Sequence, residues 1–132
     1  MTAAIYVNQS RSVPYADAIA RGLKPIETRT RDVLGQFVGQ RVLVIRTQAG
    51  KPAAIIGSVR IVDKRFCSAA ELEDLRDQTL IPPGSKFDCK GRGKWCYFLN
   101  GAYSTFQPVP LSDCKVIKKT RSFCMISDWE VK

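Results

Sequence analysis

Short apolar runs, each bounded by glycine, proline or polar residues, recur along most of this chain. Runs of this length that are rich in valine, isoleucine and aromatic residues are typical of β-strands. Six such strands are expected, at residues 5–7, 26–30, 41–47, 53–62, 94–99 and 102–107. Residues 41–47 are apolar on both faces, as expected for a strand that is covered on each side. The pattern predicts an α+β, mainly β fold: a compact β-barrel of about six strands with two short helices.

Two positions inside these strands carry a signal of their own. Asn100-Gly101 is the favoured pair for a two-residue type I′ turn, so residues 94–107 are expected to form a hairpin. Gly57 lies in the middle of another strand, where a glycine commonly marks a bulge, a bend or the close approach of another group. The sequence leaves these three alternatives for Gly57 open.

Two helices are expected between the strands. Pro14 suits the first position of a short helix, and Gly22 suits the position just beyond its end. Ser68 and Glu71 have the spacing of a capping box, which predicts a second helix that continues to about Gln78.

The length of 132 residues fits one domain that can bury a core of its own. We expect this domain to span residues 1–132, with its core at about 5–111 and a basic C-terminal extension at 112–132. No apolar run approaches the length needed to cross a bilayer, and the N-terminus lacks the basic-then-apolar layout of a signal peptide. These observations predict a cytoplasmic protein with no membrane partner, and a monomer is the default expectation.

Positive charge is in clear excess along the chain. Lysine and arginine number 21 against 12 aspartates and glutamates, which gives a net charge of +9 at pH 7. A single domain this basic favours an anionic partner, and nucleic acid or a nucleotide-like ligand is the first candidate. The alternative is a protein that is basic for solubility alone.

The chain has five cysteines and no histidine. The cysteines show no C-x-x-C spacing, so neither a zinc site nor any other metal or cofactor is expected. Reduced, mostly buried thiols are the simpler account. Without histidine, Ser-His-Asp and Cys-His mechanisms are excluded, and any catalysis must use lysine, carboxylate, tyrosine, cysteine or bound water.

The segment from Gly22 to Arg29 gathers three ionisable side chains between the first helix and the second strand. Pro25 removes a backbone donor and disfavours helix before it, so the chain is expected to turn there and then run extended. Glu27 and Arg29 would share one face of that strand, with Lys24 within reach at the turn. A surface ion pair would explain these residues structurally, and a binding site would explain them functionally.

A basic, glycine-rich loop follows the second predicted helix. Its cations are Lys86, Lys90, Arg92 and Lys94, which lie within nine residues. Glycines let backbone N–H groups come close to an anion, and the cations would neutralise phosphate charge. We predict a phosphate-contacting loop, and the alternative is a solvated, mobile loop.

Aromatic side chains flank these charged groups. Phe87, Trp95 and Tyr97 adjoin the basic loop and are candidates to stack on a base. Tyr15, in the first helix, is either a core aromatic with its hydroxyl at the rim or a contact for a ligand.

The charged segment resembles the Gly-x-Lys-x-x-Glu-x-Arg signature of ASCH domains, small β-barrel modules related to PUA domains. The signature positions are Gly22, Lys24, Glu27 and Arg29, and all four match. A second, weaker likeness is the strand that begins at Trp95 and is followed by Pro108-Val109-Pro110. The two matches bracket about residues 5–111, and the resemblance implies the PUA-like (ASCH) β-barrel fold.

The resemblance also implies two kinds of function. PUA-like modules bind RNA or a modified base in a cleft beside the barrel, which would place Lys24, Glu27 and Arg29 in the wall of a cleft for RNA, rather than DNA, or for a nucleoside-like small molecule. Some ASCH domains are instead small amidohydrolases that deacylate N4-acetylcytidine, and a few are ribonucleases. A basic structural or protein-interaction module remains as an unrelated third possibility.

In the amidohydrolase alternative, Lys24 and Glu27 are the catalytic candidates, because the counterpart of Lys24 is catalytic in the deacylating relatives. Those relatives tend to carry threonine at the position of Glu27. They also use a further mid-chain glutamate, whose equivalent among Glu71, Glu73 and their neighbours the sequence does not identify.

Overall fold

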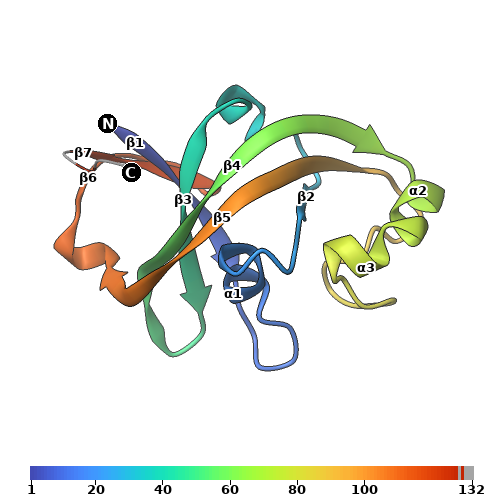
Figure 1. Cartoon of the computed structure of the whole chain (residues 1–132). Helices are drawn as coiled ribbons and strands as arrows, with labels where there is room; N and C mark the ends of the chain where they lie inside the picture. Colours follow the sequence, from blue (N-terminus) through green and yellow to red (C-terminus); the bar gives the residue numbers. More distant parts are fainter. Residues whose placement is uncertain (128, 130–132) are drawn as a thin grey trace.

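A single sheet dominates the computed structural model, which describes residues 1–127 and 129. Its strands are β1 (Thr2–Asn8), β2 (Ile26–Arg29), β3 (Arg41–Gln48), β4 (Lys51–Cys67), β5 (Lys94–Pro110), β6 (Lys115–Lys119) and β7 (Phe123–Ser127). They lie in the order β2-β5-β4-β3-β1-β7-β6 (Figure 1). β1 and β3 pair in parallel, and the other neighbouring pairs are antiparallel.

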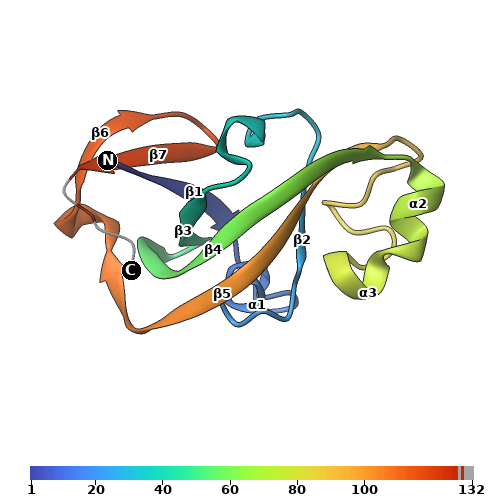
Figure 2. The ribbon, with the colours of Figure 1, turned by 45° about the horizontal axis from the view of Figure 1, so that its top comes forward.

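The predicted mainly β fold class is confirmed, with two corrections to the expected barrel. The described residues form seven strands rather than about six, because residues 94–99 and 102–107 belong to the single strand β5 and the C-terminal region supplies β6 and β7. Strand pairing does not close the sheet within the described residues, and β2 and β6 form its two edges. Figure 2 shows β4 and β5 as long, twisted neighbours that cross the molecule.

The prediction of a hairpin at Asn100-Gly101 is wrong. β5 runs without interruption through this pair and remains antiparallel to β4 on both sides of it. Gly101 has a φ of +60° and lies at a slip in the register of the two strands. The pair forms a β-bulge, because continued hydrogen bonding to β4 satisfies more backbone groups than a local turn would.

Three short helices and two 3₁₀ turns connect the strands. The helices are α1 (Tyr15–Ala20), α2 (Ala69–Asp74) and α3 (Arg76–Thr79), and the 3₁₀ turns are Gly35–Phe37 and Leu111–Asp113. Pro14 caps α1 rather than occupying its first position. None of the helices in the described part of the chain has the length and hydrophobicity that crossing a bilayer requires.

The capping box predicted at the second helix is confirmed. Ser68 Oγ accepts from the Glu71 amide at 3.2 Å, and Glu71 Oε1 accepts from the Ser68 amide at 3.1 Å. The helix does not continue unbroken to Gln78, because the chain tightens at Leu75, whose amide donates to Leu72 O. The expected single helix is therefore two, α2 and α3.

Close packing of α1 against the sheet explains Gly57. A Cβ at this position would lie 2.9 Å from the Cβ of Ala20 and nearer still to the backbone oxygen of Tyr103. The register of β4 and β5 also shifts between Ile55 and Gly57. Of the three alternatives, the structure shows close approach together with a bulge.

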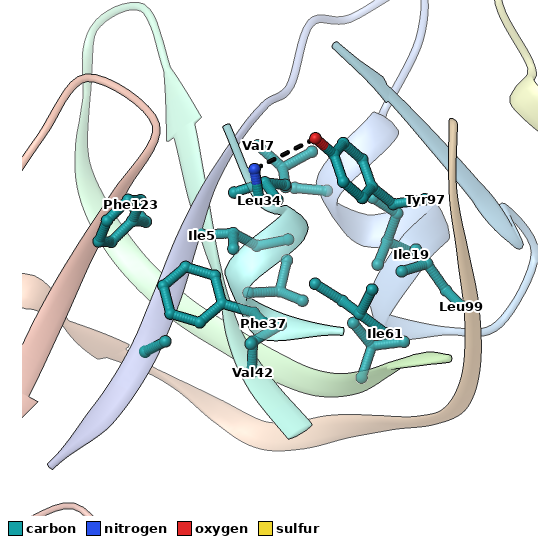
Figure 3. Close-up of a cluster of buried hydrophobic side chains, with 14 of the residues drawn as sticks. Ile5, Val7, Ile19, Leu34, Phe37, Val42, Ile61, Tyr97, Leu99 and Phe123 are labelled. Atoms are coloured by element: carbon teal, nitrogen blue, oxygen red, sulfur yellow. Dashed lines mark hydrogen bonds between the residues drawn. The ribbon is translucent and has the colours of Figure 1, made fainter. Parts of the chain in front are cut away.

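The main core lies between α1 and the central strands, with the residues after β2 covering one side (Figure 3). Tyr97 of β5 is fully buried there, so it does not form a stacking surface for a base. Its hydroxyl donates to Asp32 Oδ1 at 2.7 Å and accepts from the Leu34 amide at 3.2 Å. These hydrogen bonds tie the segment after β2 to β5.

The region expected as a C-terminal extension contributes two strands to the sheet. β7 pairs with β1 and buries Phe123, Cys124 and Ile126. β6 is exposed along its whole length at the edge of the sheet. Residues 128 and 130–132 of the expected extension lie outside the described residues.

All five cysteines are free thiols, and Cys67, Cys96 and Cys124 are buried. Burial raises the pKa of Cys96 to about 12, with the neighbouring Cys67 thiol acting in the same direction. A thiol in this state is a poor nucleophile at neutral pH.

Candidate ligand-binding cleft

A cleft of about 280 Å³ opens beside β2, between α1 and the start of β5. The predicted site residues that line it are Tyr15, Lys24, Glu27, Arg29 and Lys94. They come from segments far apart in the sequence, and the antiparallel pairing of β2 with β5 brings two of these segments together.

The end of α1 directs Lys24 into the protein. Gly22 has a φ of +77°, and its amide donates to Ile19 O while the Leu23 amide donates to Ala18 O. This is the Schellman motif, which ends a helix at a left-handed residue. Leu23 then faces solvent, whereas Lys24 is only 1% exposed.

Two backbone carbonyls and one carboxylate surround the Lys24 ammonium. Its Nζ donates to Ile26 O at 2.7 Å and to Thr79 O at 2.5 Å, and lies 3.8 Å from Glu27 Oε1. It also lies 5.3 Å from the centroid of the Tyr15 ring. Burial lowers the pKa of Lys24, and the negative charge of Glu27 partly opposes that shift. The lysine therefore ties β2 to the end of α3 and faces the cleft.

Glu27 is a buried acceptor held from both sides. Its Oε1 accepts from the Thr28 amide at 3.0 Å, and its Oε2 accepts from Arg29 Nη2 at 3.3 Å. Arg29 Nη2 also donates to Tyr6 O at 2.6 Å, which fixes the guanidinium against β1. The predicted pair of Glu27 and Arg29 is present, but both side chains are largely buried, so it is not an ordinary surface ion pair.

Lys94, at the start of β5, and Phe87, in the loop before it, form another part of the cleft wall. Lys94 is buried, and its Nζ donates to Phe87 O at 2.5 Å. Burial lowers the pKa of Lys94, with Glu27 acting in the opposite direction. The Phe87 ring meets Tyr15 edge to face with centroids 5.7 Å apart, and Ile81 adds a further apolar side chain.

The rest of the predicted basic loop does not reach the cleft. Three of its cations are exposed and do not line the cleft: Lys86, Lys90 and Arg92. Asp88 holds the loop in place, because it accepts from the Gly84 amide at 2.8 Å and from Arg76 Nη2 at 3.2 Å. These hydrogen bonds lower the pKa of Asp88 to about 2. The loop thus contributes Lys94 and Phe87 to the cleft and leaves its other cations on the surface.

The polar lining residues that were not predicted from the sequence include three outside the signature segment: Asn8, Thr47 and Arg121. Asn8 and Thr47 are partners at the ends of the parallel strands β1 and β3. Arg121 lies in the turn between β6 and β7. No local motif marks any of the three, because each reaches the cleft through pairing between distant strands.

The mid-chain glutamates lie outside the cleft. Glu71 caps α2 and pairs with Arg65 at 3.0 Å, and Glu73 pairs with Arg76 at 2.7 Å. Glu27 is the sole carboxylate in the described part of the lining. Among the residues that the structure describes, no three potential metal ligands cluster together.

Trp95 also lies elsewhere, so it is not a stacking surface in the cleft. Its ring meets Phe66 with centroids 5.6 Å apart, and Lys64 Nζ lies 5.3 Å from its centroid. Of the three aromatics expected to stack on a base, Phe87 lines the cleft, and so does Tyr15, the possible ligand contact in the first helix.

The open β-sheet with a short N-terminal helix and a charged cleft beside β2 has the fold of an ASCH domain, as the motif predicted. The structure resembles the crystal structure of ASCH from Zymomonas mobilis, with a TM-score of 0.66, 17% sequence identity, and coverage of 83% of this chain and 74% of that chain. A serine-to-alanine mutant of that protein matches with a TM-score of 0.65 and 18% identity, covering 83% of this chain and 75% of its own. A tyrosine-to-phenylalanine mutant matches with a TM-score of 0.62 and 16% identity, covering 83% of this chain and 76% of its own. By sequence, no protein-family model and no curated protein matches.

Proposed function

We propose that this protein binds a nucleobase, carried by RNA or by a nucleoside-like ligand, in the cleft around Glu27. The observation that carries the proposal is a buried carboxylate set among cations in a cleft with aromatic walls. The volume of about 280 Å³ lies near the lower end of the range for small-ligand sites. A cleft of this size suits one base rather than a stacked duplex.

Glu27 is suited to recognising an exocyclic amino group. Each carboxylate oxygen accepts one hydrogen bond from the protein, which leaves further acceptor capacity on both. Carboxylates accept from cytosine N4 in nucleic-acid recognition. Phe87 and Tyr15 supply apolar surface against which the flat base would pack.

The charges of the lining favour an anionic ligand. In the described lining, four cationic side chains and one carboxylate give a formal balance of 4 − 1 = +3. They are Lys24, Arg29, Lys94, Arg121 and Glu27. Such a balance attracts phosphate next to the base.

The direct test is the binding of cytidine 5′-monophosphate and uridine 5′-monophosphate, measured by calorimetry. Glu27→Gln should weaken binding of the cytidine nucleotide about tenfold, because one base-edge hydrogen-bond pair accounts for about 1–3 kcal/mol. Binding of the uridine nucleotide should not weaken, since uridine presents a carbonyl at this position. Asp74→Asn, an exposed carboxylate outside the cleft, is the control. Equal affinities of Glu27→Gln and the native protein for the cytidine nucleotide would contradict the proposal.

A buried lysine beside a carboxylate supports a second candidate, deacylation of an N4-acylated cytidine. A lysine whose pKa is lowered by burial serves as a base or nucleophile, and Glu27 would carry the proton. Donation from Nζ to the carbonyls of Ile26 and Thr79 instead favours a lysine that stays protonated and holds a ligand. Binding is therefore the preferred function.

Incubation with N4-acetylcytidine, followed by chromatography, separates the two candidates. Release of cytidine that is lost in Lys24→Met would establish the hydrolase. Tight binding of the cytidine nucleotide without turnover would establish the binding module.

A further inference from the structure

A second, larger hollow of about 600 Å³ opens directly beside the cleft. Arg29 and Arg121 line both hollows, so the two meet at these guanidinium groups. Residues 30–33, which follow β2, form one side of the second hollow, and the turn at residues 120–123 forms the other. We call this hollow the side groove.

The turn that carries Arg121 is firmly held. Thr120 Oγ1 accepts from the amides of Ser122 and Phe123 at 3.2 and 3.1 Å. The Tyr6 amide donates to Ser122 O at 3.1 Å, which pins the turn to β1. Figure 2 shows this end of the β6–β7 hairpin beside the segment that follows β2. Arg121 is therefore presented at a fixed place between the cleft and the side groove.

The cations of the side groove are available to a ligand. Among the described residues, neither Arg31 nor Arg121 forms an ion pair with a carboxylate. Within that part of the chain, Arg29 donates two hydrogen bonds, and both come from Nη2. Its other N–H groups are therefore left to donate to a ligand. Asp32, the one acidic residue in the described lining, is neutralised by Lys64 at 2.5 Å.

We infer that the side groove holds the sugar-phosphate backbone of a single-stranded nucleic acid whose base occupies the cleft. This inference rests on the proposed function. A base can enter the cleft only when it is unstacked, and single strands present such bases without further disruption. Arginine suits phosphate because its planar group donates two parallel hydrogen bonds. The shared arginines would lie beside the nucleotide in the cleft, and Arg31 would contact a phosphate of a neighbouring nucleotide.

The test compares three probes by fluorescence anisotropy and calorimetry: cytidine 5′-monophosphate, a single-stranded pentaribonucleotide with a central cytidine, and its deoxyribose equivalent. We expect the pentamers to bind at least tenfold more tightly than the mononucleotide at low salt. Arg31→Ala should weaken pentamer binding about tenfold, as expected for a charged hydrogen bond, and leave the mononucleotide unchanged. It should also reduce the slope of log affinity against log salt by about 0.7, the value for one phosphate of a single strand. The ribose and deoxyribose pentamers then show whether the 2′-hydroxyl is read.

Lys115→Ala is the matched control, because it removes one exposed positive charge from β6 and lines neither hollow. Equal affinities of pentamer and mononucleotide, or an Arg31→Ala variant with native pentamer binding and salt slope, would overturn the side groove while leaving the base cleft intact. If Glu27→Gln bound cytidine 5′-monophosphate as tightly as the native protein, that result would instead count against the proposed function itself.

Discussion

At the scale of single residues, the cleft is unusual because it buries charge. Removing a lysine and a glutamate from water is unfavourable unless hydrogen bonds and opposite charges compensate. Lys24 has two carbonyls and a carboxylate near it, and Glu27 has an amide and a guanidinium. Buried, hydrogen-bonded ionisable groups in a cleft are characteristic of functional sites.

The lowered pKa of Lys24 predicts how stability depends on pH. Since burial brings this pKa below the ordinary 10.5, the unfolded chain holds the proton more tightly than the folded protein. The free energy of unfolding should therefore rise as pH increases from the folded-state pKa toward 10.5, by about 1.4 kcal/mol for each unit of lowering. Lys24→Met should lack this rise.

Urea denaturation from neutral pH to about pH 10 provides the measurement. The cysteines and tyrosines of the unfolded chain also ionise toward the upper end of this range, and the native-minus-Lys24→Met difference removes their contribution because both proteins share them. The exposed Lys115→Met serves as the control and should follow the native profile. A native-minus-Lys24→Met difference that stays constant over this range would refute the expectation.

At the scale of elements, two glycines fix how α1 meets the sheet and the cleft. Gly57 gives α1 room to pack on β4, and Gly22 turns the chain from α1 toward β2. Their requirements differ physically. Gly22 needs a left-handed backbone but has space for a methyl group, since the nearest atom to an added Cβ is the Ala102 Cβ at 3.6 Å. Gly57 has no space at all.

We therefore expect Gly57→Ala to destabilise the protein more than Gly22→Ala. The left-handed conformation at Gly22 should cost alanine about 1–2 kcal/mol. A methyl group at Gly57 would overlap the Tyr103 backbone and the Ala20 side chain, so a loss of about 3 kcal/mol or more is expected. Urea midpoints of the two variants give the comparison, and the reverse order would show that the packing of α1 has been misread.

The elements also show which parts of the structure were predictable from sequence. The capping box at Ser68 and the signature from Gly22 to Arg29 act through near neighbours, so their local geometry could be read directly. Asn100-Gly101 failed because pairing with β4, far away in the sequence, overrode the local turn preference. Arg121 could not be placed in the cleft, because its position depends on how β7 pairs with β1, whereas Lys94 was among the predicted ligand contacts.

At the scale of the whole molecule, the C-terminal strands complete both the core and the proposed binding surface. β7 lies between β1 and β6, and its Phe123 meets Phe37 edge to face with centroids 4.8 Å apart. The same hairpin places Arg121 at the junction of the cleft and the side groove. The exposed lysines of β6 suit a free sheet edge, where positive charge discourages pairing with another strand.

Two isoleucines in this hairpin test whether it belongs to the folded core. Ile126 of β7 is 1% exposed and packs in a cluster with Ala4, Leu43 and Ile45, whereas Ile117 of β6 is 49% exposed. Ile126→Ala should lower the free energy of unfolding by about 2–5 kcal/mol, because it removes buried methyl groups and leaves a cavity. Ile117→Ala should change it by no more than about 0.5 kcal/mol, as is usual for surface positions. Urea denaturation of both variants measures these changes in the free energy of unfolding. Small, similar losses in both would mean that the C-terminal hairpin is not part of the folded core. Only a large loss in Ile126→Ala supports one cooperative unit that includes the cleft.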